Sequence, residues 1–425
     1  MNIANLYEAF LRCASLSIDT RTIGPNSLFV ALKGERFDAN TFAQNALDLG
    51  ASYVIIDNAD YYIDERTLLV EDSLVALQKL AQHHRRQLGL PIVALTGSNG
   101  KTTTKELILA VLSKKYNTKA TKGNLNNHIG VPLTLLSFTH ETEIGIVEMG
   151  ANHQKEIELL CAIAEPDFGY ITNFGKAHLE GFGGVEGVIK GKSEMYTHLF
   201  SHQKLAFINA DDAIQWEKST THPRFTFTTK ENTADVTFGP IEANPFVTIT
   251  YQNTVIHSHL IGLYNATNIC AAITIGKYFK VDTDAIKEAI EGYIPENNRS
   301  QIIQKNNYEI ILDAYNANPS SLKLALENFM QLSKTPKIAI LGDMFELGPE
   351  SEEEHRQIVQ LIPEASDLVC HFIGNWFNRV KTSQNNLHFY PDFDAFKAQF
   401  KTNAPALVLI KGSRGMALER VLELL

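Results

Sequence analysis

Cysteine and tryptophan are scarce in this sequence: its 425 residues include four cysteines and two tryptophans. The cysteines lie roughly a hundred residues apart, which excludes the paired spacing of a zinc motif and the dense pairing of a disulfide framework. We therefore expect buried thiols, in a protein of a reducing compartment, at Cys13, Cys161, Cys270 and Cys370.

Long apolar runs and an excess of basic residues are also missing. Nowhere do about 18 apolar residues follow one another, and no basic segment precedes an apolar stretch at the N-terminus. Acidic residues outnumber basic ones by 48 to 38, which gives a net charge of −10 and argues against a general nucleic-acid or membrane-surface role. We expect a cytoplasmic enzyme with no nucleic-acid partner and no membrane insertion. Because the net charge is negative, any anionic ligand must be bound by a local group of residues.

The chain has enough length and apolar material for several domains. Hydrophobic residues make up 44% and charged residues 20%, as in soluble globular proteins, and 425 residues are too many for one core. Short strands alternate with helical stretches along the whole sequence. This pattern predicts an α/β protein of three domains, with boundaries at 1–86, 87–298 and 299–425.

The first domain is predicted to be a small α/β unit. Gly50 is well placed to end its helix at 41–49. Its strands are expected at 27–32, 53–57 and 67–70.

In the central domain, each strand is followed by a helix-like segment, which implies a parallel sheet with helices on both faces. The strands are expected at 92–95, 144–149, 168–172 and 205–209. Between 225 and 260 an alternating pattern of Thr, Val, Phe, Ile and Tyr indicates antiparallel strands that extend this domain. Helices at 266–279 and 284–291 and a linker at 292–298 follow.

The last domain repeats the strand and helix alternation. This predicts a Rossmann-like, doubly wound sheet. Its strands are expected at 309–313, 337–342, 368–374, 387–390 and 406–411.

A glycine-rich segment, Thr96-Gly-Ser-Asn-Gly-Lys-Thr-Thr103, follows one strand of the central domain and opens a helix. Gly97 and Gly100 let successive N–H groups converge on an anion, and the helix N-terminus adds its partial positive charge. Lys101 can reach the terminal phosphates of a nucleotide, while the Thr102 hydroxyl is placed to hold Mg²⁺. The spacing is shorter than the usual P-loop pattern, and an ordinary glycine turn that caps a helix is the alternative.

Two further polar residues stand where parallel strands end, at the edge that collects ligands. Glu148 is a second candidate Mg²⁺ ligand, since hard cations at phosphate sites take oxygen ligands. A solvated acid at a strand end is its alternative. His178 could bind a second metal ion, although a lone loop histidine is more often a surface or core residue.

Five motifs, in this order, resemble those of the ATP-dependent Mur ligases, which build the peptide of the bacterial cell-wall precursor. They are 96–103, 148–150, 173–178, 192–194 and 209–212. Other segments look like those of the family member that adds D-alanyl-D-alanine. These segments are 19–21, 29–38, 121–136, 313–319, 341–348 and 411–414.

The resemblance implies the domain roles, the ligands and the reaction. The three domains would bind the UDP end of UDP-N-acetylmuramoyl-tripeptide, ATP, and D-alanyl-D-alanine, respectively, in a monomer with two Mg²⁺ ions. It also implies that CO₂ carbamylates Lys192, which gives this side chain a carboxylate-like group; an exposed helical lysine is the alternative.

The resemblance also implies the site residues. Catalysis would fall to Lys101, His178 and Lys192, and metal binding to Thr102, Glu148, His178 and Lys192. The nucleotide would contact Gly97, Ser98, Asn99, Gly100, Lys101, Thr102, Thr103, Asn265, Asn268, Arg299 and Asp313. The other substrates would contact Thr20, Arg21, Lys33, Asp38, Asn126, Asn127, Tyr315, Asn316, Asn318, Lys411 and Arg414.

Some positions depart from the family pattern. Its usual Asp-Gly-His after the N-terminal Phe is Asp38-Ala39-Asn40, the first acid of an Asp pair is Leu312, and a His before the central Asn is Tyr264. Two alternatives stay open. One is an amide ligase of the same framework that adds a single amino acid or extends folate with glutamate, and the other is a P-loop protein that binds nucleotide without joining substrates. We interpret His355, in a very acidic segment, as part of a solvated face.

Overall fold

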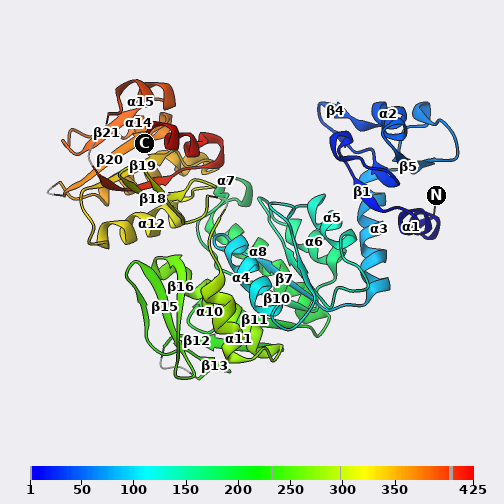
Figure 1. Ribbon diagram of the computed structural model, residues 1–425, viewed down its shortest axis with the longest axis horizontal. Coiled ribbons are helices and arrows are strands. Elements are labelled where there is room, and N and C mark those ends of the chain that lie inside the picture. The colour runs from blue at the N-terminus through cyan, green and yellow to red at the C-terminus, as the bar shows by residue number, and fades with distance from the viewer. Residues whose placement is uncertain (1, 231–232, 297, 365, 402–404) are drawn as a thin grey trace.

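The computed structural model describes residues 2–230, 233–296, 298–364, 366–401 and 405–425, and it confirms an α/β protein of three units. The N-terminal unit, in blue, and the C-terminal unit, in yellow to red, lie apart, each beside the central unit (Figure 1). Each unit is built on its own mainly parallel sheet. The exact boundaries between the units stay a prediction.

The N-terminal unit has a parallel sheet of order β1-β2-β5-β6. Alternate residues of its strands face opposite sides, so that Val54 and Ile56 pack under α2, while Leu28 and Ile55 pack against α1 and α3. Its strands are β1 (Ser15–Ser17), β2 (Ser27–Val30), β5 (Ala51–Ile56) and β6 (Thr67–Leu69), with the hairpin β3 (Lys33–Gly34) and β4 (Phe37–Asp38). Its helices are α1 (Ile3–Leu11), α2 (Ala43–Asp48) and α3 (Ser73–Leu88).

The helix α3 joins this unit to the central one. Asp72 caps its start by accepting the Val75 N–H, and Gly89 ends it in a left-handed conformation with φ 62°. Near that end, Arg85 donates to Asp167 at 2.8 Å. Asp167 directly precedes β10, so the ion pair joins the end of α3 to the start of an inner strand of the central sheet.

The central sheet has seven parallel strands in the order β13-β12-β11-β10-β7-β9-β8. Val93 and Leu95 face α4, α10 and α11, while Ile92 and Ala94 face α5, α6 and α8. Its strands are β7 (Ile92–Thr96), β8 (Thr118–Ala120), β9 (Ile144–Glu148), β10 (Phe168–Ile171), β11 (Leu205–Asn209), β12 (Arg224–Thr228) and β13 (Val236–Thr237). Its helices are α4 (Lys101–Leu112), α5 (Gly130–Leu136), α6 (Glu156–Ala164), α7 (Leu179–Phe182), α8 (Val185–Ser201), α9 (Ala213–Ser219), α10 (Ala266–Tyr278) and α11 (Thr283–Gly292).

The segment after residue 224 corrects one prediction. β12 and β13 pair in parallel with the central sheet, so the antiparallel prediction was wrong for them. It is right for a separate three-stranded sheet of β14 (Ile241–Ala243), β15 (Phe246–Tyr251) and β16 (Thr254–Ile261). Residue alternation reports the burial of strand faces but not strand direction, which explains the error.

The C-terminal sheet has the order β17-β18-β22-β19-β20-β21, with helices on both faces, as expected of a doubly wound domain. Its antiparallel edge strand β17 (Gln301–Lys305) was not predicted. The other strands are β18 (Tyr308–Asp313), β19 (Lys337–Gly342), β20 (Leu368–Ile373), β21 (Leu387–Tyr390) and β22 (Ala406–Lys411). Its helices are α12 (Pro319–Gln331), α13 (Ser351–Gln360), α14 (Asn375–Arg379) and α15 (Phe393–Gln399).

Short 3₁₀ helices complete the described chain. They are η1 (Thr20–Thr22), η2 (Ala39–Phe42), η3 (Ala59–Tyr61), η4 (Leu263–Asn265), η5 (Gly348–Glu350), η6 (Arg414–Met416) and η7 (Leu418–Leu424). Among the described helices, none combines the length and the apolar character needed to cross a membrane.

Two smaller expectations need correction. His355 lies on α13 and is fully buried, so it is not part of a solvated face; its Nε2 accepts the Met344 N–H at 3.0 Å. Its spacing from Ile358 and Val359, which are also buried, gave the correct signal. Three of the four cysteines are buried as expected, whereas Cys13 is only half-buried.

The buried Asn40 holds together a corner of the N-terminal unit. Its amide donates to Asp38 at 2.6 Å and to Asp57 at 2.8 Å, and its oxygen accepts the Asp57 N–H at 3.0 Å. Asp57 also pairs with Lys33 at 2.8 Å. The departure from the family pattern at position 40 therefore has a structural role in this chain.

We predict that Asn40→Leu destabilises the N-terminal unit by about 2 to 4 kcal/mol, because it removes the buried amide that donates to Asp38 and Asp57 and the oxygen that accepts the Asp57 N–H. Hydrogen exchange of the β5 amides should accelerate by roughly 30- to 1000-fold in consequence. Gln44→Leu is the matched control, since Gln44 is exposed and bonds Asp48 at the surface. Equal exchange rates in Asn40→Leu and the unchanged protein would contradict this role.

Candidate active site

A cavity of about 990 Å³ lies where the central and C-terminal units meet. The ends of β7, β9 and β10 open into it from one side, and the segment after β18 and the start of α12 from the other. Most of the predicted site residues line it: Ser98, Asn99, Gly100, Lys101, Thr102, Thr103, Asn126, Asn127, Glu148, His178, Asn265, Asn268, Arg299, Asp313, Tyr315, Asn316, Asn318 and Lys411. The structure therefore brings together motifs that lie far apart in the sequence.

The glycine loop joins β7 to α4, as predicted, and its backbone approaches its neighbours closely. Gly97 has φ 140°, and a Cβ there would overlap Thr172; Gly100 has φ 78°, and a Cβ there would lie 2.6 Å from the Asn268 Oδ1. Lys101 donates from Nζ to the Gly97 carbonyl at 2.7 Å. The loop thus holds its lysine over its own backbone, where a bound phosphate would lie.

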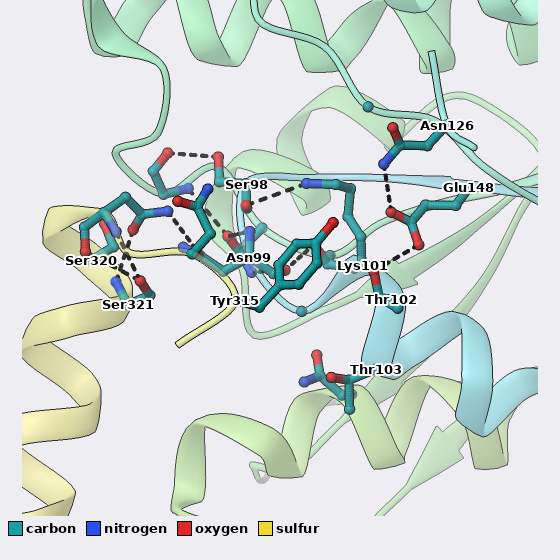
Figure 2. Close-up of a pocket in the computed structure, with 18 of the residues that line it drawn as sticks. Ser98, Asn99, Lys101, Thr102, Thr103, Asn126, Glu148, Tyr315, Ser320 and Ser321 are labelled. Atoms are coloured by element: carbon teal, nitrogen blue, oxygen red, sulfur yellow. Dashed lines mark hydrogen bonds between the residues drawn. The ribbon is translucent and has the colours of Figure 1, made fainter. Parts of the chain in front are cut away.

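Glu148 is buried at the end of β9 and holds the Thr102 hydroxyl. That hydroxyl donates to the Glu148 Oε2 at 2.9 Å, and the Asn126 amide donates to Oε1 at 2.8 Å. Figure 2 shows Asn126 and Glu148 on one side of Lys101 and Thr102. Since Glu148 is only 1% exposed, it is not a solvated acid at a strand end.

Lys105 is a buried lysine beside Glu148 that was not predicted from the sequence. Its side chain is 3% exposed, and its Nζ lies 3.9 Å from the Glu148 Oε2. Burial lowers the pKa of Lys105. Its position one helical turn after Lys101 was the available signal, because residues four apart share a helix face.

Lys192 is buried on α8 rather than exposed. It is 1% exposed, its Nζ donates to the Ala151 carbonyl at 3.1 Å, and it lies 4.9 Å from the centre of the Phe182 ring. Burial, and to a lesser extent the charge of Lys101, holds the pKa of Lys192 well below its usual value. A neutral amine is the form that reacts with CO₂; carbamylation itself stays a prediction.

His178 lies in the loop after β10, with a left-handed backbone at φ 53°. Its Nδ1 is in hydrogen-bond contact with the Glu346 Oε2 of the C-terminal unit, and this contact lowers the pKa of the Glu346 carboxyl. Glu346 was not predicted as a site residue.

The oxygen donors fit Mg²⁺ at one position. Thr102 and Glu148 offer a hydroxyl and a carboxylate side by side, and Mg²⁺ bound with phosphates needs few protein ligands. Among the residues that the structure describes, no three His, Cys, Asp or Glu side chains form a group that could hold a metal ion by themselves. Any bound ion would therefore depend on phosphate oxygens and water as well.

The expected nucleoside contacts lie on two sides of the cavity. Asn268 donates to the Asn265 Oδ1 at 2.9 Å and accepts from the Thr104 hydroxyl at 3.1 Å. Across the cavity, the Arg299 guanidinium lies 3.6 Å from the centre of the Tyr315 ring. The Tyr264 hydroxyl lies 3.3 Å from the Ser300 hydroxyl, near Asp313.

Lys411 and Arg414 have different surroundings. The buried Lys411 donates to Asp313 at 2.5 Å, so its charge is already paired. Arg414 is 60% exposed and pairs with Glu419 at 2.8 Å. The structure places only Lys411 at the cavity.

The expected contacts to the UDP end lie in the N-terminal unit, away from this cavity. Arg21 pairs with Asp19 at 2.6 Å, and Lys33 with Asp57. Thr20 belongs to η1 beside Arg21. Lys33 and Asp38 lie opposite each other in the β3–β4 hairpin. The contact of these four residues with a substrate stays a prediction.

The glycine loop, the buried carboxylate Glu148 and the facing C-terminal unit are the features of a nucleotide-binding site of the P-loop type. The protein is therefore a three-domain nucleotide-binding protein of this class. The comparisons with known proteins identify its family. Family models match along the chain: Mur ligase family, catalytic domain, at residues 12–85; Mur ligase middle domain at 95–276; and Mur ligase, glutamate ligase domain, at 298–414.

Two similar proteins are named UDP-N-acetylmuramoyl-tripeptide--D-alanyl-D-alanine ligase. That of Bacillus subtilis (strain 168) is 34% identical, with 96% of this chain and 92% of the relative covered. That of Escherichia coli (strain K12) is 34% identical, with 99% and 95% covered. The chain belongs to the Mur ligase family.

Solved structures agree with this assignment. MurF from Acinetobacter baumannii superposes with a TM-score of 0.87 at 29% identity, over 99% of this chain and 98% of that one. MurF ligase from Thermotoga maritima, in complex with ADP, superposes with a TM-score of 0.82 at 27% identity, over 97% of each chain.

We predict that Gly100→Ala weakens ADP binding about tenfold or more, because its Cβ displaces Asn268 and strains the loop. Gly123→Ala is the matched control: Gly123 also has a positive φ, 53°, but a Cβ there meets nothing within 4 Å. It should leave ADP affinity within about threefold of the unchanged protein. Isothermal titration calorimetry with ADP measures both, and equal losses in the two variants would contradict the prediction.

Proposed function

We propose that this chain is an ATP-dependent ligase that joins UDP-N-acetylmuramoyl-tripeptide to D-alanyl-D-alanine in peptidoglycan precursor synthesis, as its relatives' names describe for them. The observation that carries the proposal is the cavity that the glycine loop shares with the C-terminal unit. A phosphate-binding loop that faces a second domain can present an activated group to an acceptor held by that domain. The two substrates would therefore meet at the terminal phosphate of ATP.

The chemistry requires activation, because a carboxylate is a poor electrophile. An oxygen of the tripeptide carboxylate attacks the γ-phosphorus, and the bond from that phosphorus to the bridging oxygen of ADP breaks. The resulting acyl phosphate supplies a leaving group. The amine of the dipeptide then attacks the carbonyl carbon through a tetrahedral intermediate, phosphate departs and the nitrogen loses a proton.

The residues of the site support these reaction steps by their positions and charges. Lys101 and the N–H groups of the glycine loop stabilise the negative charge that shifts during phosphoryl transfer. Mg²⁺, held by Thr102 and Glu148, would supply further charge neutralisation on the phosphates. Closure of the two domains excludes water that would hydrolyse the activated carboxyl group.

A second Mg²⁺ ion is part of the proposal. We place it near His178, with Lys192 carbamylated by CO₂ as a further oxygen donor. The burial of Lys192 and the lowered pKa of its amine support this modification.

The remaining substrates have their own places in the proposal. The UDP end lies on the N-terminal unit at Thr20, Arg21, Lys33 and Asp38. The acceptor meets the cavity wall formed by Tyr315, Asn316, Asn318 and Lys411. We propose that Arg414, which lies outside the cavity, reaches the dipeptide only if it exchanges its partner Glu419. A monomer accounts for all of these contacts.

We predict ADP release that requires ATP, Mg²⁺, UDP-N-acetylmuramoyl-tripeptide and D-alanyl-D-alanine together. The measurement is a coupled ADP assay that compares the dipeptide with single amino acids as acceptors. Turnover with a single amino acid alone would keep the family and overturn the proposed acceptor. No turnover with any acceptor would favour a P-loop protein that binds nucleotide only.

Lys101→Ala provides the control for this assay. It removes the ammonium group that reaches the phosphates, and acceptor-dependent ADP release should disappear. Lys122→Ala serves as the matched surface control, because Lys122 is exposed and follows β8 at the same end of the central sheet. ADP release near the unchanged rate in Lys101→Ala would contradict the role of the glycine loop.

A further inference from the structure

The C-terminal unit contacts one loop of the central unit through hydrogen bonds and an ion pair. This loop, residues 173–180 after β10, is called here the docking loop. The backbone N–H of Lys176 donates to the Ser320 hydroxyl at 2.9 Å, and its Nζ pairs with Glu354 at 2.5 Å. The Glu180 N–H donates to the Glu346 carbonyl at 3.3 Å. The second half of the docking loop therefore packs against the C-terminal unit.

His178 and Glu346 meet at the centre of this contact, through Nδ1 and Oε2. Both are non-glycine residues with a left-handed backbone, at φ 53° and φ 61°. Each such conformation costs roughly 1 to 3 kcal/mol and persists only where the surroundings enforce it. His178 belongs to the central unit and Glu346 to the C-terminal unit. Their strained backbone conformations are therefore stabilised by the contact between the two units.

The chemistry of the pair points to a purpose. A histidine that binds a metal ion nearly always donates its other ring N–H to a carboxylate or carbonyl, which fixes the ring and its tautomer. With Nδ1 occupied by Glu346, Nε2 is the nitrogen left for a ligand. His178 lines the cavity beside the phosphate loop, and its side chain is 21% exposed.

We propose that Glu346 is a positioning residue that orients His178 toward the second metal site, so that this site is complete only when the C-terminal unit is docked. The inference rests on the proposed role of His178 in metal binding. Domain docking and binding of the second ion are then coupled: an open enzyme lacks the carboxylate that orients the ring. Phosphoryl transfer from ATP to the carboxylate would then follow docking of the C-terminal unit rather than precede it.

The experiment measures Mn²⁺ binding to the full-length protein in the presence of ADP, by the electron paramagnetic resonance signal of free Mn²⁺. Two ions should bind the unchanged protein. His178→Ala should lose the second ion, and Glu346→Ala should weaken it about 10- to 100-fold while the first ion is retained. Glu346→Asp should restore part of the affinity, because it returns a carboxylate to the same place.

The control for charge is Glu353→Gln, on the exposed face of α13, where Glu353 pairs with Arg356 at 2.6 Å. Its Mn²⁺ binding should equal that of the unchanged protein. In the double variant His178→Ala with Glu346→Ala, the first ion should bind as in His178→Ala alone, since Glu346 acts only through His178. If Glu346→Ala does not fold, Glu346→Gln and Glu346→Asp carry the same comparison.

Three results would overturn the inference, and they differ from a failure of the proposed function. If Glu346→Ala binds Mn²⁺ as the unchanged protein does while His178→Ala loses the second ion, Glu346 does not position His178, and the metal role of His178 stands. Weaker binding of the first ion in the double variant than in His178→Ala would show that Glu346 acts elsewhere. Unchanged binding in His178→Ala would remove the metal role of His178, while dipeptide-dependent ADP release would still support the ligase.

Discussion

The close packing of the glycine loop against the chain after β10 positions the rest of the site. The Thr172 hydroxyl donates to the Asn99 carbonyl at 2.6 Å, and the Ser98 hydroxyl donates to the Gly175 carbonyl at 2.6 Å. Gly97 lies so near Thr172 that no Cβ fits. The same chain continues into the docking loop, so one segment connects the phosphate site to the C-terminal unit. Rigid support of this kind is what a site needs when catalysis depends on position and electrostatics.

Charge at the site is concentrated in buried groups. Glu148 is surrounded by the Thr102 hydroxyl, the Asn126 amide and the Lys105 ammonium group, and it is almost completely removed from water. Charges interact more strongly in such surroundings than at the surface. An isolated buried charge is costly, however, and the nearby Lys105 ammonium group compensates the charge of the buried Glu148 carboxylate. The arrangement prepares an oxygen site whose charge is compensated before a cation arrives.

The sequence predicted the parts of the structure that local pattern determines. β19, β21 and β22 match the expected ranges because buried parallel strands are continuous apolar runs. The strand, glycine loop and helix of the phosphate site followed from the order of residue types. The parallel pairing of β12 and the pairing of Lys411 with Asp313 could not be predicted in the same way. They depend on which segments become neighbours in space, and no local pattern carries that information.

The most direct measurement follows the oxygen atoms of the tripeptide carboxylate. With that carboxylate labelled with ¹⁸O, and with ATP and D-alanyl-D-alanine present, the phosphate released is analysed by mass spectrometry. Activation through an acyl phosphate predicts one labelled oxygen in each phosphate, because the carboxylate oxygen that attacked phosphorus leaves with it. Unlabelled phosphate, formed together with the amide product, would contradict phosphoryl activation of the substrate at this site.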